Sequence, residues 1–73
     1  MNDHQDLEDP DAPIRARLVV AQQEHYDLDV AVQALAVAPV PDMMVISRLK
    51  RKKLLLKDEI ERLKDQLTPD IIA

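Results

Sequence analysis

The apolar residues of this chain form two heptad stripes that are mirror images about the turn Pro39-Val40-Pro41. In each stripe the spacing alternates between three and four residues, which places the side chains along one face of a helix. The first stripe consists of Ile14, Leu18, Ala21, His25, Leu28, Val32 and Leu35, and the second of Ile46, Leu49, Lys53, Leu56, Ile60, Leu63 and Leu67. Paired outwards from the turn, their residue numbers always sum to 81. We call these fourteen positions the seam.

This mirror symmetry predicts an all-α fold, an antiparallel two-helix coiled-coil hairpin, because each layer of the seam then joins one side chain from each helix. The pattern predicts a helix over 13–38, a turn over 39–42 and a second helix over 43–68. Residues 1–12 are acidic and contain one large apolar residue, so we expect a mobile tail there. A short C-terminal tail is expected over 69–73.

Proline and aspartate residues set the expected helix ends. The residue before a proline is disfavoured in the helical conformation, so the first helix should extend to about Ala38. Asp11 or Ala12 is expected to cap its beginning, with Pro13 as the first helical residue. Asp42 is the expected cap of the second helix.

The composition limits the classes of function that a chain of 73 residues can have. It contains no cysteine and no glycine, which excludes disulfides, thiolate zinc sites and glycine-rich phosphate loops. No apolar run is long enough to cross a bilayer, and the acidic beginning does not look like a secretory leader. We therefore expect a cytoplasmic protein without membrane insertion.

A single seam provides little core for a domain of this size, so the sequence predicts a second apolar contact. The first helix carries a looser apolar stripe of Val19, Tyr26, Val30 and Val37, and Met43, Met44, Val45, Leu54 and Leu55 lie off the seam of the second. We expect a homodimer that forms a four-helix bundle. The alternative is a monomeric hairpin that binds another, unknown protein.

Two polar residues, His25 and Lys53, interrupt the seam in adjacent layers. Lys53 can extend along Leu28 to reach Asp29, for which Lys50 is a second possible partner. The first interpretation of His25, Asp29 and Lys53 is a polar layer that fixes the register of the hairpin. A metal or acid–base site is the alternative, but no second ligand lies at a suitable spacing. We therefore expect no enzyme, no metal and no cofactor.

Some charges at the edges of the seam are expected to favour pairing of the two helices, and others to oppose it. Asp29 and Lys50 should attract across the helices, whereas the pairs Glu24 with Glu59 and Arg15 with Lys64 should repel. We therefore expect the mirrored seam and the short turn, rather than edge charges, to determine the pairing.

Residues 48–53 contain five of the ten basic residues of the chain. Arg48, Lys50, Arg51 and Lys52 are expected on the outward face of the second helix, where they could contact nucleic-acid phosphates or another anion. A solvated charged face is the alternative. The face lacks aromatic residues that stack on bases, and an amphipathic membrane helix is less favoured because the seam uses the apolar stripe.

Two motifs carry a resemblance to a known family. They are Gln23-Glu24-His25-x-x-Leu28-Asp29-x-x-Val32 and Leu49-Lys50-x-x-Lys53-Leu54-x-Leu56-Lys57-Asp58-x-Ile60. With them the chain resembles the YdcH-like family of small, uncharacterised bacterial proteins. The resemblance implies a self-associating helical hairpin with no known enzymatic activity, and it assigns no catalytic residue. We therefore expect a small interaction or structural module, and nucleic-acid-associated or regulatory binding is the alternative.

Overall fold

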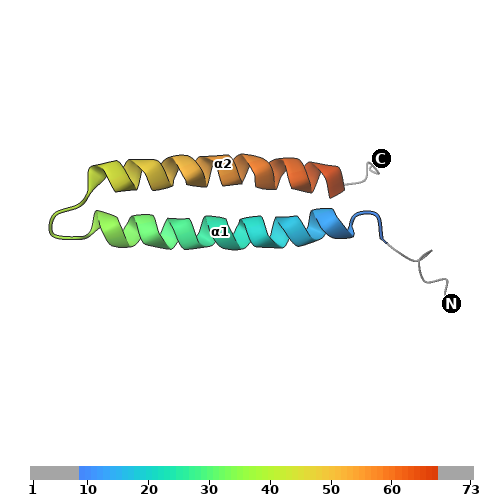
Figure 1. Ribbon diagram of the computed structural model, residues 1–73, viewed down its shortest axis with the longest axis horizontal. Coiled ribbons are helices and arrows are strands. Elements are labelled where there is room, and N and C mark those ends of the chain that lie inside the picture. The colour runs from blue at the N-terminus through green and yellow to red at the C-terminus, as the bar shows by residue number, and fades with distance from the viewer. Residues whose placement is uncertain (1–8, 68–73) are drawn as a thin grey trace.

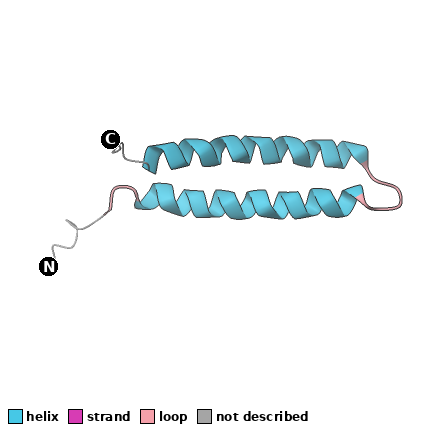
Figure 2. Ribbon diagram, turned by 180° about the vertical axis from the view of Figure 1, so that it is seen from behind, coloured by secondary structure: helices cyan, strands magenta, loops and turns pink. Residues whose placement is uncertain are grey.

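The protein is a hairpin of two helices, shown by a computed structural model that describes residues 9–67 (Figure 1). Helix α1 is Ala12–Ala36 and helix α2 is Met43–Leu67, with 25 residues each. The helices lie side by side and antiparallel in both views, joined at one end by residues 37–42 (Figures 1 and 2). No strand occurs between residues 9 and 67. The predicted all-α hairpin is confirmed. Most of the predicted N-terminal tail and all of the C-terminal one lie outside the described residues.

The contact between the helices lies on the predicted seam. All fourteen seam residues are buried or half-buried. Four of them form the buried core, namely Ala21, Val32, Ile46 and Leu63, with exposed fractions of 0%, 7%, 4% and 9%. The others are half-buried because two helices alone cannot enclose a side chain from every direction. The mirrored spacing therefore identifies the side chains that pack together.

Helix α1 ends at Ala36, two residues before the predicted end, and the prolines of the turn explain the difference. In a continuing helix the carbonyls of Leu35 and Val37 would accept hydrogen bonds from residues 39 and 41. Both of those residues are prolines and have no N–H to donate. The Ala38 N–H instead donates to the Leu35 carbonyl at 3.2 Å, which closes the helix with a tighter turn.

Helix α2 begins at Met43, as predicted, and Asp42 caps it. The carboxylate Oδ1 of Asp42 accepts hydrogen bonds from the N–H groups of Met44 and Val45, both at 3.1 Å. These are two of the donors that the first turn of a helix leaves without a partner. The cap therefore defines where the chain leaves the turn.

The beginning of α1 differs from the prediction. The helix begins at Ala12, so Pro13 is its second residue, and the Asp11 side chain makes no capping hydrogen bond. A capping side chain normally accepts from the second or third helical N–H, and Pro13 has none. The Asp9 carboxylate instead accepts the N–H of Asp11, the residue before the helix, at 2.8 Å and also pairs with Arg15. The Asp9 carbonyl accepts the Ala12 N–H at 3.0 Å.

Candidate functional site

An ion pair in the middle of the hairpin joins the two helices. The Nζ atom of Lys53 lies 2.6 Å from Oδ1 of Asp29, and the side chains are 27% and 38% exposed. Lys53 therefore reaches Asp29 as the sequence predicts. Lys50, the second possible partner, is exposed and forms no ion pair within residues 9–67.

The surroundings of Asp29 stabilise its charged form. The hydrogen bond from Lys53 lowers the pKa of Asp29 below its ordinary value, against the opposing effect of partial burial. The charge of Lys53, the electrostatic interaction with His25 and a hydrogen bond from Gln33 Nε2 to Asp29 Oδ2 at 3.1 Å act in the same direction. Asp29 is therefore a carboxylate at neutral pH, with partners on both helices.

His25 is half-buried at the edge of the seam. It lines a shallow groove together with Gln22, Lys57, Ile60, Glu61 and Lys64. Within residues 9–67 no three side chains of the metal-binding types lie close enough together to hold an ion. His25 lies about one helical turn before Asp29 on α1, and its place in a polar layer with Asp29 and Lys53 stays a prediction.

A second ion pair between the helices was not predicted from the sequence. The Arg17 guanidinium donates two hydrogen bonds of 2.7 Å to the carboxylate of Glu59. Arg17 also lies 3.7 Å from Glu24, so it contacts both carboxylates that we expected to repel. Arg17 therefore offsets the expected repulsion between Glu24 and Glu59. Arg15, expected to face Lys64, pairs with Asp9 instead.

The contact between Arg17 and Glu59 shifts both ionisation equilibria. The hydrogen bond lowers the pKa of Glu59 and raises that of Arg17, so both groups are held in their charged forms. Each residue directly precedes a seam residue, Leu18 or Ile60, and lies at the edge of the helix contact. The position of both residues beside the seam was the feature of the sequence that could have suggested this ion pair. The two residues lie at different heights along the hairpin, and the long arginine side chain spans that difference.

The basic face of α2 is open to solvent. Arg48, Lys50, Arg51 and Lys52 are all exposed. None of the four forms an ion pair with another residue of the described chain. The acidic residues between 9 and 67 therefore do not neutralise this face through direct contacts, which leaves four cations available to an external anion.

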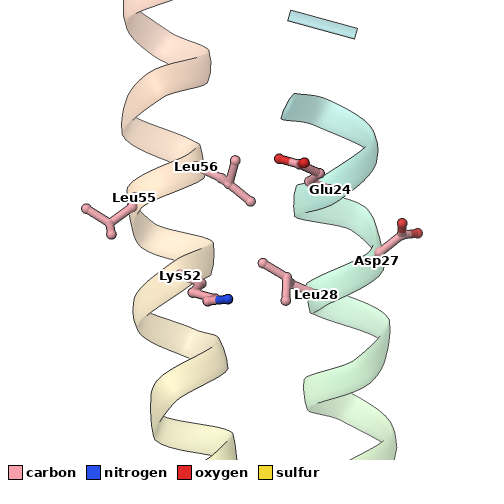
Figure 3. A pocket seen from close by; sticks show the side chains of 6 residues that line it. All are labelled: Glu24, Asp27, Leu28, Lys52, Leu55 and Leu56. Atoms are coloured by element: carbon pink, nitrogen blue, oxygen red, sulfur yellow. The ribbon is translucent and has the colours of Figure 1, made fainter. Parts of the chain in front are cut away.

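An open groove of about 460 Å³ runs beside the seam. It is lined by Glu24, Asp27, Leu28, Lys52, Leu55 and Leu56. In Figure 3 Leu28 and Leu56 point toward each other, Glu24 and Lys52 extend from opposite helices, and Asp27 and Leu55 point away from the gap. The groove has apolar walls and edges of opposite charge, an arrangement that suits contact with protein side chains.

The outer face of α1 and Val37, the residue that follows the helix, form an apolar stripe that no described element covers. Val19, Tyr26, Val30 and Val37 are 64%, 63%, 47% and 81% exposed. Such large apolar side chains in one line on a small protein are typical of an interaction surface. We call these four residues the α1 stripe.

The fold and these surfaces define a small helical hairpin whose candidate functional residues form faces and edges for contact. The family model named Protein of unknown function (DUF465) matches residues 20–64, and the chain belongs to this family. The resemblance to the YdcH-like proteins is thereby confirmed. The matched region includes the polar layer, the basic face and the turn. No curated protein and no solved structure matches the chain.

Proposed function

We propose that the protein is a non-enzymatic interaction module of the bacterial cytoplasm that self-associates into a homodimer. In this dimer two hairpins form a four-helix assembly, and its central contact is between their two α1 stripes. The observation that carries the proposal is the exposure of this stripe on the side of α1 that faces away from α2. A third protein could then bind the dimer at the open grooves.

The spacing of the stripe supports a single continuous contact. Val19, Tyr26, Val30 and Val37 are separated by seven, four and seven residues. At about 3.6 residues per turn, these separations are close to whole numbers of turns, so the four side chains lie along one line of the helix. The charged residues of α1 after Leu18 are Glu24, Asp27 and Asp29, and none of them lies on that line.

The size of the core also supports self-association. The four buried residues include alanine, and no large side chain within the described chain is fully buried. Small domains with so little buried surface usually gain stability from an oligomer, a metal or disulfides. The chain has no cysteine, which leaves association as an available source of that stability.

The mass in solution tests the proposal. Light scattering coupled to size exclusion at tens of micromolar should give twice the chain mass of 8.3 kDa. The double substitution Tyr26→Glu with Val30→Glu should reduce it to one chain, because both side chains are exposed in the single hairpin and can change without unfolding it. Leu54→Glu, at a similarly exposed position on α2, is the control and should remain a dimer. A native mass of one chain would contradict the proposal.

A second candidate function, binding of nucleic acid, is favoured by the four unpaired cations of the basic face. Duplex and single-stranded DNA or RNA should then bind at low salt and dissociate as salt increases. Binding should be lost when Arg48, Lys50, Arg51 and Lys52 are changed to glutamate. Absence of binding at low salt would exclude this function.

A further inference from the structure

The connecting turn and the first residues of α2 carry strongly exposed apolar side chains. Val40, Met44 and Met43 are 87%, 76% and 65% exposed. We call these three residues the tip. They lie between the seam residues Leu35 and Ile46, at the end of the hairpin where the chain turns (Figure 1). Apolar side chains gathered at one end of a hairpin form a compact surface that is suited to contact with an apolar medium.

The charge of the hairpin is divided between its two ends. Residues 28–53, the part nearer the turn, contain five basic and two acidic residues, a formal charge of +3. Residues 9–27 and 54–67, the other described part, contain five basic and eight acidic residues, a formal charge of −3. Although the chain has a net negative charge, the end of the hairpin at the turn is positively charged, and the tip lies at this end.

The basic face lies close to the tip along the axis of α2. Arg48 follows Met43 by five residues and Lys52 by nine, which corresponds to roughly 7 and 13 Å along a helix that rises about 1.5 Å per residue. The acidic residues of α2 begin at Asp58, roughly 22 Å from Met43 on the same scale. Since the Debye length at physiological salt is about 8 Å, the acidic residues from Asp58 onward are screened from a surface at the tip, whereas Arg48 lies within one Debye length of it.

The backbone of the turn is also suited to a poorly hydrated environment. Pro39 and Pro41 have no N–H group, so the turn has two fewer donors that require water. The single charge at the tip belongs to Asp42, whose carboxylate already accepts two backbone hydrogen bonds. Placing this turn among lipid headgroups therefore leaves few polar groups without a partner.

From these observations we propose that the tip docks on an anionic lipid surface. The apolar side chains of the tip would enter the boundary between headgroups and acyl chains, while Arg48, Lys50, Arg51 and Lys52 contact the headgroups. Neither described helix is both long and apolar enough to cross a membrane, so the contact is peripheral. A nucleic acid would contact the same cations but leave the tip exposed, and the basic face offers no aromatic ring to stack on bases.

Co-sedimentation of the full-length protein with vesicles tests the contribution of the tip. We expect binding to vesicles of equal parts phosphatidylglycerol and phosphatidylcholine, much weaker binding to pure phosphatidylcholine, and a decrease with salt. Val40→Ser with Met44→Ser removes apolar surface without changing charge and should weaken binding by at least about 10-fold. Leu54→Ser with Leu55→Ser, at exposed positions of α2 away from both the tip and the α1 stripe, is the matched control and should bind like the native protein.

A second pair of variants separates the position of the charge from its total. Arg48→Glu with Arg51→Glu should reduce vesicle binding by roughly 30-fold or more, since each cation near such a surface contributes about fivefold. Lys57→Glu with Arg62→Glu changes the net charge by the same amount on the other half of α2 and should have little effect. Equal losses in both variants would contradict docking through the tip.

A nitroxide label gives a readout that does not depend on any loss of binding. The chain has no cysteine, so Val40→Cys and Gln66→Cys each accept a single label. On binding, the label at position 40 should become protected from a water-soluble relaxation agent, and the label at position 66 should stay accessible. The proposal is overturned if phosphatidylglycerol vesicles do not bind at low salt or if position 40 stays accessible. It is also overturned if duplex DNA displaces the vesicles and binds the Val40→Ser, Met44→Ser protein unchanged.

Discussion

Helices α1 and α2 have the same length and share one seam, but their outer faces differ. α1 contains five charged residues and α2 contains twelve. α2 is therefore amphipathic in the ordinary sense, with one apolar face against its partner and one charged face in water. α1 is apolar on both faces, a pattern found where a helix is covered from two sides. The difference indicates that α1 supplies the second contact of the module and that α2 supplies its charged surface.

The largest expected effect distinguishes the seam from the outer faces. Leu28→Asp removes a half-buried leucine from the central layers of the seam and places a carboxylate there, so it should destabilise the hairpin by about 2 kcal/mol or more. Circular dichroism should show a loss of helicity at room temperature. Leu54→Asp introduces the same charge on the outside of α2, where the leucine is 66% exposed, and should preserve the helical signal. Unchanged helicity and melting of the Leu28 variant would contradict the register.

A smaller effect distinguishes the beginnings of the two helices. Asp42→Ala removes two capping hydrogen bonds from α2 and should cost about 1 kcal/mol of unfolding free energy. Asp11→Ala should cost much less, because the Asp11 side chain makes no capping hydrogen bond. Thermal or urea unfolding of both variants measures the difference. Equal destabilisation by the two substitutions would show that Asp11 caps α1 in solution.

The smallest expected effect is on the pH dependence of stability. The pKa values of Asp29 and Glu59 are lowered in the folded hairpin, so their carboxylates favour folding above the ordinary carboxyl pKa values near about 4. This contribution is lost as the pH falls through the lowered folded values. We therefore expect the melting temperature to decrease as the pH falls below about 4 and through the lowered pKa values of the folded state.

Substitution of the two carboxylates identifies the origin of this acid sensitivity. Asp29→Asn with Glu59→Gln should lower stability at neutral pH and flatten its decrease in acid. The control, Asp65→Asn with Glu61→Gln, changes the charge equally on the exposed outside of α2 and should leave the profile close to the native one. A native-like decrease in the first variant would show that the interhelical ion pairs do not cause it.

The parts of the structure that could be predicted are those that periodicity determines. The seam and the Lys53–Asp29 contact follow from heptad spacing, because both connect residues at nearly the same height in the hairpin. Arg17 and Glu59 lie at different heights in the hairpin. Their ion pair forms because the arginine side chain is long, and the heptad register does not predict it. The early end of α1 depends on donors missing at Pro39 and Pro41, which the helical pattern does not show. The exposure of the tip likewise could not be predicted from periodicity, because it depends on which residues the ends of the two helices leave uncovered.

The change of valine and leucine methyl NMR signals on dilution tests the difference between the two helices most directly. Self-association through the α1 stripe predicts that the methyl shifts of Val19 and Val30 change from hundreds of micromolar to the low micromolar range. The methyl shifts of Leu54 and Leu55, which are similarly exposed on α2, should stay constant. Constant valine shifts in a single-chain species, or changes confined to Leu54 and Leu55, would contradict a second contact on α1.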